Sequence, residues 1–168
     1  MRIDLTNIPS EGKSLNFTLT PDWWKPDLDE DRLMGLEAPI SASIKLYPAG
    51  KKIAVEGSLS TRLVLRCDRC LEPYGWDLST DFRIYLSIAP FKGELDVELS
   101  EDDLSLDFID GEFLDPAQII REQIILSVPM KTLCRKDCKG LCPVCGCNLN
   151  MTRCSCSSTY ETSLYQNS

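Results

Sequence analysis

Residues 52–67 read KIAVEGSLSTRLVLRC, and this stretch decides the fold class. Most of its apolar residues lie two positions or a multiple of two apart: Ile53, Val55, Leu59, Leu63, Leu65 and Cys67. A strand turns successive side chains to opposite faces, so this period predicts a long strand with one buried face. A strand of this length must twist, bend or bulge, and we expect this at Gly57.

The segments on both sides repeat the pattern. ISASIKLY (residues 40–47) precedes the long strand across the turn sequence PAGK, and WDLSTDFRIYLSI (residues 76–88) follows it. Connections this short join antiparallel neighbours, so the three segments predict an antiparallel meander. SLNFTLT (residues 14–20) predicts a shorter strand, and residues 21–35 predict a loop or a short helix near residues 31–34.

The sequence DPAQIIREQIILSVP predicts the one main helix, near residues 116–128. Asp115 suits the N-cap, Pro116 suits the first turn, and Gln118 could complete a capping box. One face of this helix is apolar through Ile120, Ile124 and Val128. The expected fold is therefore α+β: a twisted antiparallel β meander with one main helix and a C-terminal zinc-ribbon-like module.

We expect three parts along the chain. Residues 1–130 form the β-rich body with its helix, residues 131–160 form a cysteine-rich zinc module docked on the body, and residues 161–168 form a tail. The chain has 168 residues and is 43% hydrophobic, which is enough for a core that needs no disulfides. The beginning of the sequence lacks a secretion signal and no stretch is apolar enough to span a membrane, so we expect a cytoplasmic protein.

The charge and the lack of histidine narrow the function. The sequence contains no histidine, which excludes Ser-His-Asp catalysis and zinc sites with histidine ligands. The net charge is −8, but residues 94–115 hold ten of the 26 acidic residues and no basic one. The rest of the chain has 16 acidic and 18 basic residues, a net charge of +2. A basic face is therefore possible away from the acidic segment.

The nine cysteines are the strongest functional signal. In a reducing compartment they are more readily metal ligands than disulfide partners. Eight form closely spaced pairs, which suits two structural zinc sites with four thiolates each and leaves Cys147 spare. The pairs are Cys67 and Cys70, Cys134 and Cys138, Cys142 and Cys145, and Cys154 and Cys156.

The combination of these pairs into sites is open from spacing. We favour Cys67 and Cys70 with Cys134 and Cys138 as site one, and the last four as site two. The rival pairing places Cys134, Cys138, Cys142 and Cys145 in one site. The hairpin pair, Cys67 and Cys70, would then join Cys154 and Cys156 or bind no metal. Iron–sulfur binding is the main alternative to zinc, because its clusters also use four thiolates. Disulfides conflict with the expected compartment, and a redox CxxC pair belongs between a strand and a helix.

Basic residues surround the cysteines. Those that we single out are Arg66, Arg69, Lys131, Arg135, Lys136 and Lys139. They could offset the charge of the thiolates, or they could contact RNA phosphates, and both uses need the same residue types.

Three pieces of the sequence resemble the YceD family, a family of bacterial and plastid proteins. LVLRCDRCLEPY resembles its CxRCL segment, IIREQIILSVPMKTLC resembles its helix end, and CRKDCKGLCPVCGCNLNMTRCSC resembles its many-cysteine branch. The resemblance covers about residues 10 to 157. It implies a ribosome-biogenesis factor that supports accumulation or processing of large-subunit ribosomal RNA, and it supplies no catalytic residue.

We therefore expect a non-enzymatic factor with two zinc ions. Its partners would be a large-subunit ribosomal RNA precursor, a ribosomal protein, or both, and no membrane or small-molecule substrate is evident. The alternative is an enzyme. A metal-dependent ribonuclease would need convergent carboxylates such as Asp102, Asp103 and Asp107, and a thiol-redox protein would need a cysteine pair free of metal.

Overall fold

A computed structural model describes residues 2–25, 32–50, 52–88, 106–109 and 112–156. Within these ranges the chain forms eight strands, a short 3-10 helix η1 and one α-helix, α1. Their bounds are β1 (Ile3–Asp4), β2 (Lys13–Leu19), η1 (Pro21–Trp23), β3 (Leu33–Leu36), β4 (Ile40–Ala49), β5 (Lys52–Arg66), β6 (Pro73–Ile88), β7 (Leu106–Ile109), β8 (Phe113–Leu114) and α1 (Pro116–Ser127).

The main sheet has six strands, and its path runs in the order β2-β4-β5-β6-β7. Strand β5 is the centre of the sheet, because β6 pairs along residues 53–66 on one edge. The other edge of β5 is shared, with β4 beside residues 52–60 and β3 beside residues 63–65. The predicted antiparallel meander is confirmed for β4, β5 and β6, while the short β7 adds a parallel strand.

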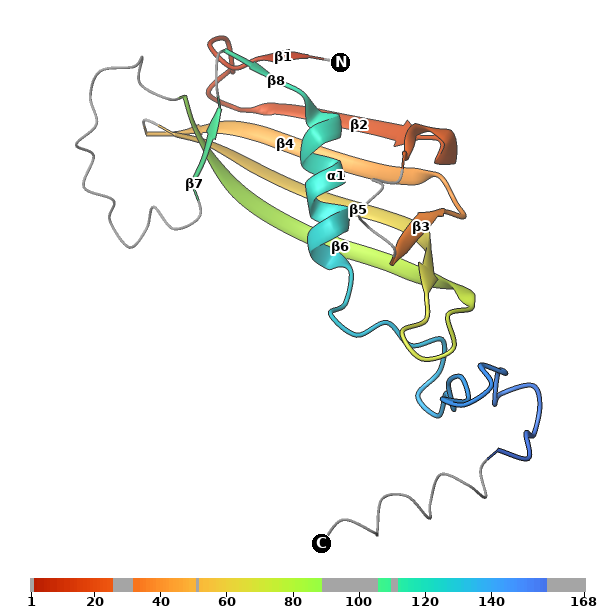
Figure 1. Ribbon diagram of the computed structural model, residues 1–168. Helices are drawn as coiled ribbons and strands as arrows, with labels where there is room; N and C mark the ends of the chain where they lie inside the picture. Colours follow the sequence, from red (N-terminus) through yellow and green to blue (C-terminus); the bar gives the residue numbers. More distant parts are fainter. Residues whose placement is uncertain (1, 26–31, 51, 89–105, 110–111, 157–168) are drawn as a thin grey trace, which may run out of the picture.

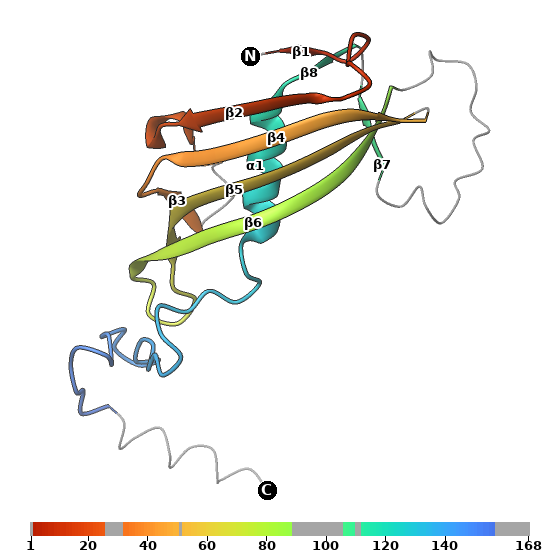
Figure 2. The same cartoon turned by 180° about the vertical axis from the view of Figure 1, so that it is seen from behind.

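The period of two is visible in the burial of the strands. Along β4, buried and exposed residues alternate from Ile40 to Leu46. The buried face of β5 carries the apolar residues that the sequence placed in one phase, with Leu63 and Leu65 fully buried. Helix α1 lies across this face, and no described helix or strand covers the opposite face of the sheet (Figures 1 and 2).

The helix begins and ends close to the predicted positions. The Asp115 side chain accepts a hydrogen bond from the backbone N–H of Ala117, as an N-cap should. The expected capping box is wrong, because the Gln118 side chain donates to Glu122 one turn further along instead. Ile119, Ile120 and Ile124 are buried against the sheet.

Two other local expectations concern Gly57 and residues 31–34. The registers of β4 and β6 with β5 continue through Gly57 without a shift, so a bulge is excluded there, while a twist or bend at Gly57 stays a prediction. The short helix expected near residues 31–34 is also absent from the described part of this region, where Leu33–Leu36 forms β3. A bulge between Leu33 and Gly35 lets this strand fit beside β5, and pairing with β5 outweighs its weak local signal.

The end of α1 brings the chain to the tip of the β5–β6 hairpin. Figure 1 shows the segment after the helix passing beside this tip and continuing into the cysteine-rich tail, which is drawn in blue. Sheet and helix therefore deliver two distant parts of the sequence to the same place. Among the described residues, no helix has the length and apolar character that crossing a membrane requires.

Candidate metal centres

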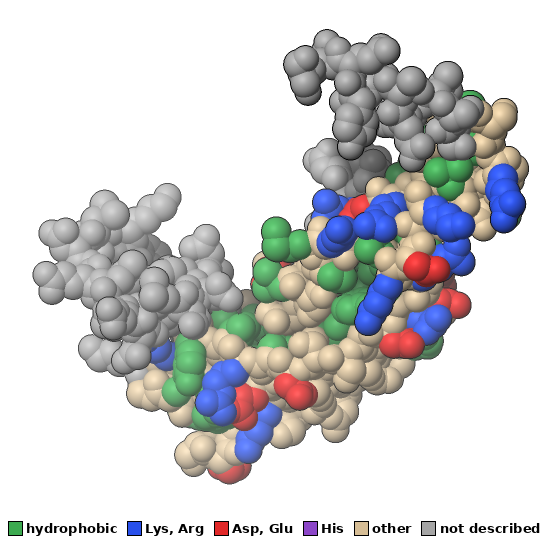
Figure 3. All heavy atoms as spheres, turned by 90° about the horizontal axis from the view of Figure 1, so that it is seen from below, with side chains coloured by type: hydrophobic (Ala, Val, Ile, Leu, Met, Phe, Trp, Pro, Cys, Tyr) green, Lys and Arg blue, Asp and Glu red, His purple; other side chains and the backbone are tan. Residues whose placement is uncertain are grey.

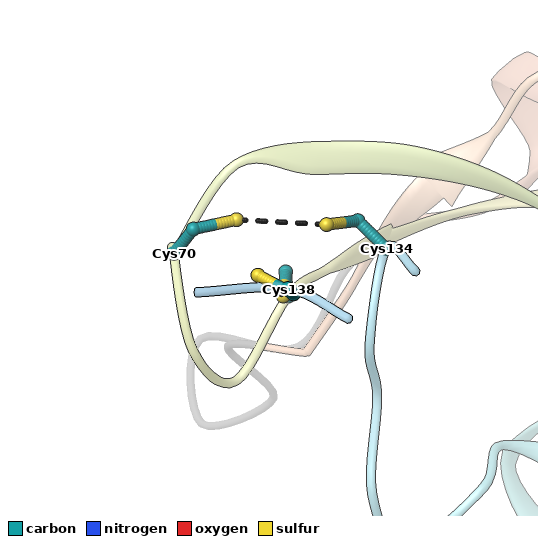
Figure 4. Close-up of side chains that lie close together, drawn as sticks. Cys70, Cys134 and Cys138 are labelled. Carbon is teal, nitrogen blue, oxygen red and sulfur yellow. Dashed lines mark hydrogen bonds between the residues drawn. The ribbon is translucent and has the colours of Figure 1, made fainter. Parts of the chain in front are cut away.

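The first cysteine quartet joins the hairpin tip to the segment after α1. It consists of Cys67, Cys70, Cys134 and Cys138, whose sulfur atoms all lie within 4.8 Å of one another. The Sγ atoms of Cys67 and Cys138 are 3.8 Å apart, and those of Cys70 and Cys134 are 3.7 Å apart. Figure 4 shows Cys70 and Cys134 pointing toward each other with Cys138 beside them. Three of the four residues are buried.

Thr132 holds these two segments together. Its side-chain hydroxyl donates to the backbone carbonyl of Arg66 at 2.7 Å. Its backbone N–H donates to the Asp68 carboxylate at 2.7 Å, and its carbonyl accepts from the Asp68 N–H at 2.8 Å. Thr132 is fully buried, although its partner Asp68 is exposed at the surface.

Arginine side chains reinforce this junction. Arg32, just before β3, donates to the carbonyl of Met130 at 2.7 Å. Arg69 donates to the carbonyl of Cys138 at 2.8 Å. Each bond connects the body to a residue of the segment that follows α1, so these two cations have structural partners.

The second quartet lies within the tail. It consists of Cys142, Cys145, Cys154 and Cys156, with sulfur atoms again within 4.8 Å of one another. An isolated antiparallel bridge between Leu141 and Asn148 closes the loop that presents the first two of them. Cys145 is exposed, which makes this quartet more open to solvent than the first.

Backbone hydrogen bonds favour negative charge at one sulfur of each quartet. Burial raises the pKa of the Cys67 thiol, but the backbone N–H groups of Cys134, Cys70 and Arg69 outweigh it and lower this pKa to about 6. The backbone N–H groups of Cys145 and Val144 lower the pKa of Cys142 to about 6 in the same way. Both quartets therefore contain a thiolate stabilised by the backbone.

Cys134 and Cys147 have the opposite tendency. Burial and hydrogen bonds with Cys70 and Cys138 raise the pKa of Cys134 to about 12. A hydrogen bond with Cys145, followed by burial, raises the pKa of Cys147 to about 12. Close thiols resist carrying several negative charges together, and a divalent cation removes this conflict.

The sulfur positions fit a single tetrahedral ion. Four sulfurs at the usual zinc–sulfur distance of about 2.3 Å are about 3.8 Å apart along each edge of the tetrahedron. The two distances given above for the first quartet agree with this spacing. They are far longer than the roughly 2.05 Å of a disulfide bond. A four-iron cluster would need wider spacing, because each of its thiolates binds a different iron.

The structure therefore brings together the cysteines of the favoured pairing. The rival quartet of residues 134–145 is split between the two groups. Cys147 belongs to neither group, although it lies close enough to Cys145 and Cys154 for hydrogen bonds.

The basic residues chosen from the sequence differ in their surroundings. Lys131, Lys136 and Lys139 are exposed, whereas Arg66 is half-buried. Arg69 bonds to Cys138, and Arg135 donates to Asn150 at 2.8 Å. Figure 3 shows Lys and Arg side chains gathered over the part of the molecule that carries the cysteine-rich tail.

Two residues that support the first quartet, Thr132 and Asn150, could not be predicted from the spacing of the cysteines. The Asn150 amide donates to Cys138 Sγ at 3.3 Å, and its oxygen accepts from the backbone N–H of Lys139 at 2.8 Å. Both are single polar residues in a loop, and their roles depend on contacts between segments that the sequence does not reveal.

The carboxylates proposed for a nuclease gain no support. Asp102 and Asp103 lie outside the described residues, as does most of the acidic segment 94–115. Asp107 lies in β7, where its backbone is paired with Leu86 of β6.

Comparison with known proteins places this architecture in a family. The model of the family described as Large ribosomal RNA subunit accumulation protein YceD matches residues 55–164. The chain belongs to the YceD family. The matched region of this YceD chain includes most of β5, all of β6 and α1, and all nine cysteines.

Curated relatives agree with this assignment. Two chloroplastic proteins, each named large ribosomal RNA subunit accumulation protein YCED homolog 1, are 29% identical in Arabidopsis thaliana and 28% identical in Zea mays, each over 70% of this chain. An uncharacterized protein of Mycobacterium leprae is 27% identical over 67% of this chain. The matches cover 44%, 48% and 50% of these proteins, so the chain spans about half the length of the curated relatives it matches. No solved structure matches the chain.

Proposed function

We propose that this YceD protein is a non-enzymatic factor that supports the accumulation of large-subunit ribosomal RNA by binding an RNA precursor. The observation that carries the proposal is the gathering of exposed basic side chains around two thiol quartets, in a family named for this RNA. The cysteines are free thiols, which suits a reducing compartment such as the cytoplasm.

The proposed metal is zinc, with one ion in each quartet. Cys67, Cys70, Cys134 and Cys138 would hold the first ion, and Cys142, Cys145, Cys154 and Cys156 would hold the second. An all-thiolate tetrahedral site has no open position for water, so zinc here would stabilise the fold rather than catalyse a reaction. The first ion would join the β-rich body to the cysteine-rich tail, and the second would fix the loop of the tail.

The proposed RNA contacts are the exposed lysines and arginines of this end of the molecule. Two zinc sites with four thiolates each carry a formal charge of −2 per site, which the basic residues partly offset. However, three cysteines of the first quartet are buried, while Lys136 and Lys139 are exposed. A phosphate at the surface therefore meets the cations before the thiolates.

The metal content tests the first part of the proposal. We expect native mass spectrometry, with elemental analysis, to find two zinc ions per chain. Cys70→Ser should lose one ion and Cys156→Ser should lose the other, because each removes one of four ligands. Cys147→Ser is the matched control and should keep both. Iron with sulfide, or loss of zinc in the control, would contradict these assignments.

Charge reversal tests the RNA part. The double variant Lys136→Glu/Lys139→Glu should bind a large-subunit ribosomal RNA fragment at least about tenfold more weakly, and its affinity should depend less steeply on salt. Lys13→Glu/Lys45→Glu changes the charge equally at the far end of the sheet and serves as the control. Fluorescence anisotropy across a salt series measures both.

The outcomes separate the candidate partners. Equal RNA affinity of the two double variants would contradict the basic end as the binding surface. If the protein binds a basic large-subunit ribosomal protein but no RNA, its partner is that protein rather than RNA. RNA cleavage by the purified protein would contradict the non-enzymatic role.

A further inference from the structure

The two CxxC turns of the molecule have the same backbone geometry. In the hairpin turn, the N–H of Leu71 donates to the carbonyl of Cys67 at 2.9 Å. In the tail turn, the N–H of Gly146 donates to the carbonyl of Cys142 at 2.9 Å. Leu71 has φ = 60° and Gly146 has φ = 72°, so the residue after the second cysteine is left-handed in both turns.

Glycine is the residue that this position favours. A side chain in the left-handed region brings Cβ close to the backbone, and glycine avoids that cost. The tail turn has glycine, whereas the hairpin turn has leucine. Among the residues that the structure describes, Leu71 is the only one other than glycine with positive φ.

Burial does not compensate for this conformation. The Leu71 side chain is 56% exposed. It is also absent from both of the apolar clusters that the described residues form. Leucine at this position therefore has an unfavourable backbone conformation and exposes apolar surface, and folding alone would be served better by glycine. A strained residue that serves no packing role points to a contact with a partner.

The surroundings of Leu71 indicate the chemistry of that partner. The backbone carbonyl of Arg69 accepts from the N–H of Leu141, which places residues 139–141 of the tail beside the hairpin turn. Both Arg69 and Lys139 are exposed there. An apolar side chain next to cations suits a strand of RNA whose bases are unpaired, because the base faces need apolar contact and the phosphates need positive charge.

A second apolar side chain lies in the adjoining loop. Glu72, next to Leu71, accepts a 3.5 Å hydrogen bond from the Asn148 side chain, and the Asn148 carbonyl accepts from the N–H of Met151. The Met151 side chain is 80% exposed. The hairpin turn and this loop therefore each carry an exposed apolar side chain, and each also carries an exposed cation, Arg69 or Lys139.

We infer that Leu71 contacts an unpaired base, and that this end of the molecule selects single-stranded RNA over duplex. This inference rests on the proposed RNA-binding function and adds the kind of RNA. In a duplex the base faces are stacked on one another, so Leu71 would have nothing to contact.

The test compares Leu71→Gly with the wild-type chain. Binding is measured by fluorescence anisotropy with a mixed-sequence 12-nucleotide RNA and with the same RNA in a duplex. Leu71→Gly should bind the single strand about tenfold more weakly, because the burial of a leucine side chain against a base would be lost, and should bind the duplex as the wild type does. Its melting temperature should be equal or higher and its zinc content unchanged, because glycine suits the turn.

Two further variants complete the experiment. Leu71→Met keeps the apolar contact and should retain binding to the single strand. Phe113→Thr removes an equally exposed apolar side chain from β8, 56% exposed, and should have no effect on binding.

Four results would overturn the inference. A melting temperature or zinc content lowered in Leu71→Gly would make Leu71 structural. Equal loss of single-strand and duplex affinity would exclude a base contact. Unchanged RNA affinity in Leu71→Gly, with affinity lost in Lys136→Glu/Lys139→Glu, would refute the role of Leu71 and leave the proposed function intact. If the wild type binds neither RNA, both proposals fail.

Discussion

Gly57 shows how one missing side chain can decide local packing. It lies in the middle of β5, opposite Phe82 on β6 and opposite Ile44 on β4. A Cβ atom at Gly57 would overlap the Phe82 ring and would come within 2.9 Å of the backbone oxygen of Ser43. The glycine therefore makes room for an aromatic ring across the strand, and the strand needs no bulge.

A methyl group at this position should destabilise the protein. We expect Gly57→Ala to lower the free energy of unfolding by about 1–3 kcal/mol, because the ring and the neighbouring backbone must move. Gly35→Ala is the matched control, since nothing lies within 4 Å of its added Cβ, and it should leave stability unchanged or raise it by up to about 1 kcal/mol. Urea unfolding measures both. Equal effects of the two variants would contradict the packing role.

At the scale of elements, the junction between the β5–β6 hairpin and the segment after α1 positions the first cysteine quartet. The two segments are 64 to 71 residues apart in sequence where their sulfurs meet. Closing so long a loop costs entropy, which the three hydrogen bonds of Thr132 and the packing of α1 help to offset. The cysteines are thus positioned by the same elements that form the core.

Thr132→Val tests this junction, because valine has nearly the same shape but lacks the hydroxyl. The carbonyl of Arg66 would lose its buried donor. We expect the free energy of unfolding to fall by about 1–3 kcal/mol. Thr18→Val on the exposed side of β2 is the control and should change stability by less than about 0.5 kcal/mol. Urea unfolding measures the stability of both variants, and their zinc content is checked. If the unfolding curves of both variants match that of the wild type, Thr132 has no role in the junction.

At the scale of the whole molecule, the two cysteine quartets lie at one end of a body that has its own core. The core cluster contains residues from both sheets and from α1, and the four cysteines of the first quartet lie outside it. Loss of metal should therefore affect this end first and leave the centre of the sheet folded.

Removal of zinc by a strong chelator should show this division. Hydrogen–deuterium exchange should become faster for residues 66–72 and 131–156, because their order depends on the ions. Amides in the paired regions of β4 and β5 should stay protected. Exchange that rises equally in all of these regions would show that the body needs the metal, contrary to this expectation.

Some features of the protein could be predicted from sequence because they depend on local patterns. The alternation of residues 52–67 predicted the central strand, and the residues from Asp115 to Pro129 predicted α1. The spacing of the cysteines predicted four pairs and two groups of four but left the pairing open, and the structure brings together the sulfurs of the favoured pairing. That they bind zinc stays a prediction.

Other features depended on contacts between distant segments. Residues 33–36 form a strand because the edge of β5 is open to them, and Gln118 bonds to Glu122 rather than completing a capping box. The hydrogen bonds of Thr132 and the left-handed conformation of Leu71 also appear only in three dimensions. The physical reason is that periodicity and spacing describe what one segment can do alone, whereas a single hydrogen bond or an unfavourable φ depends on which segment lies beside it.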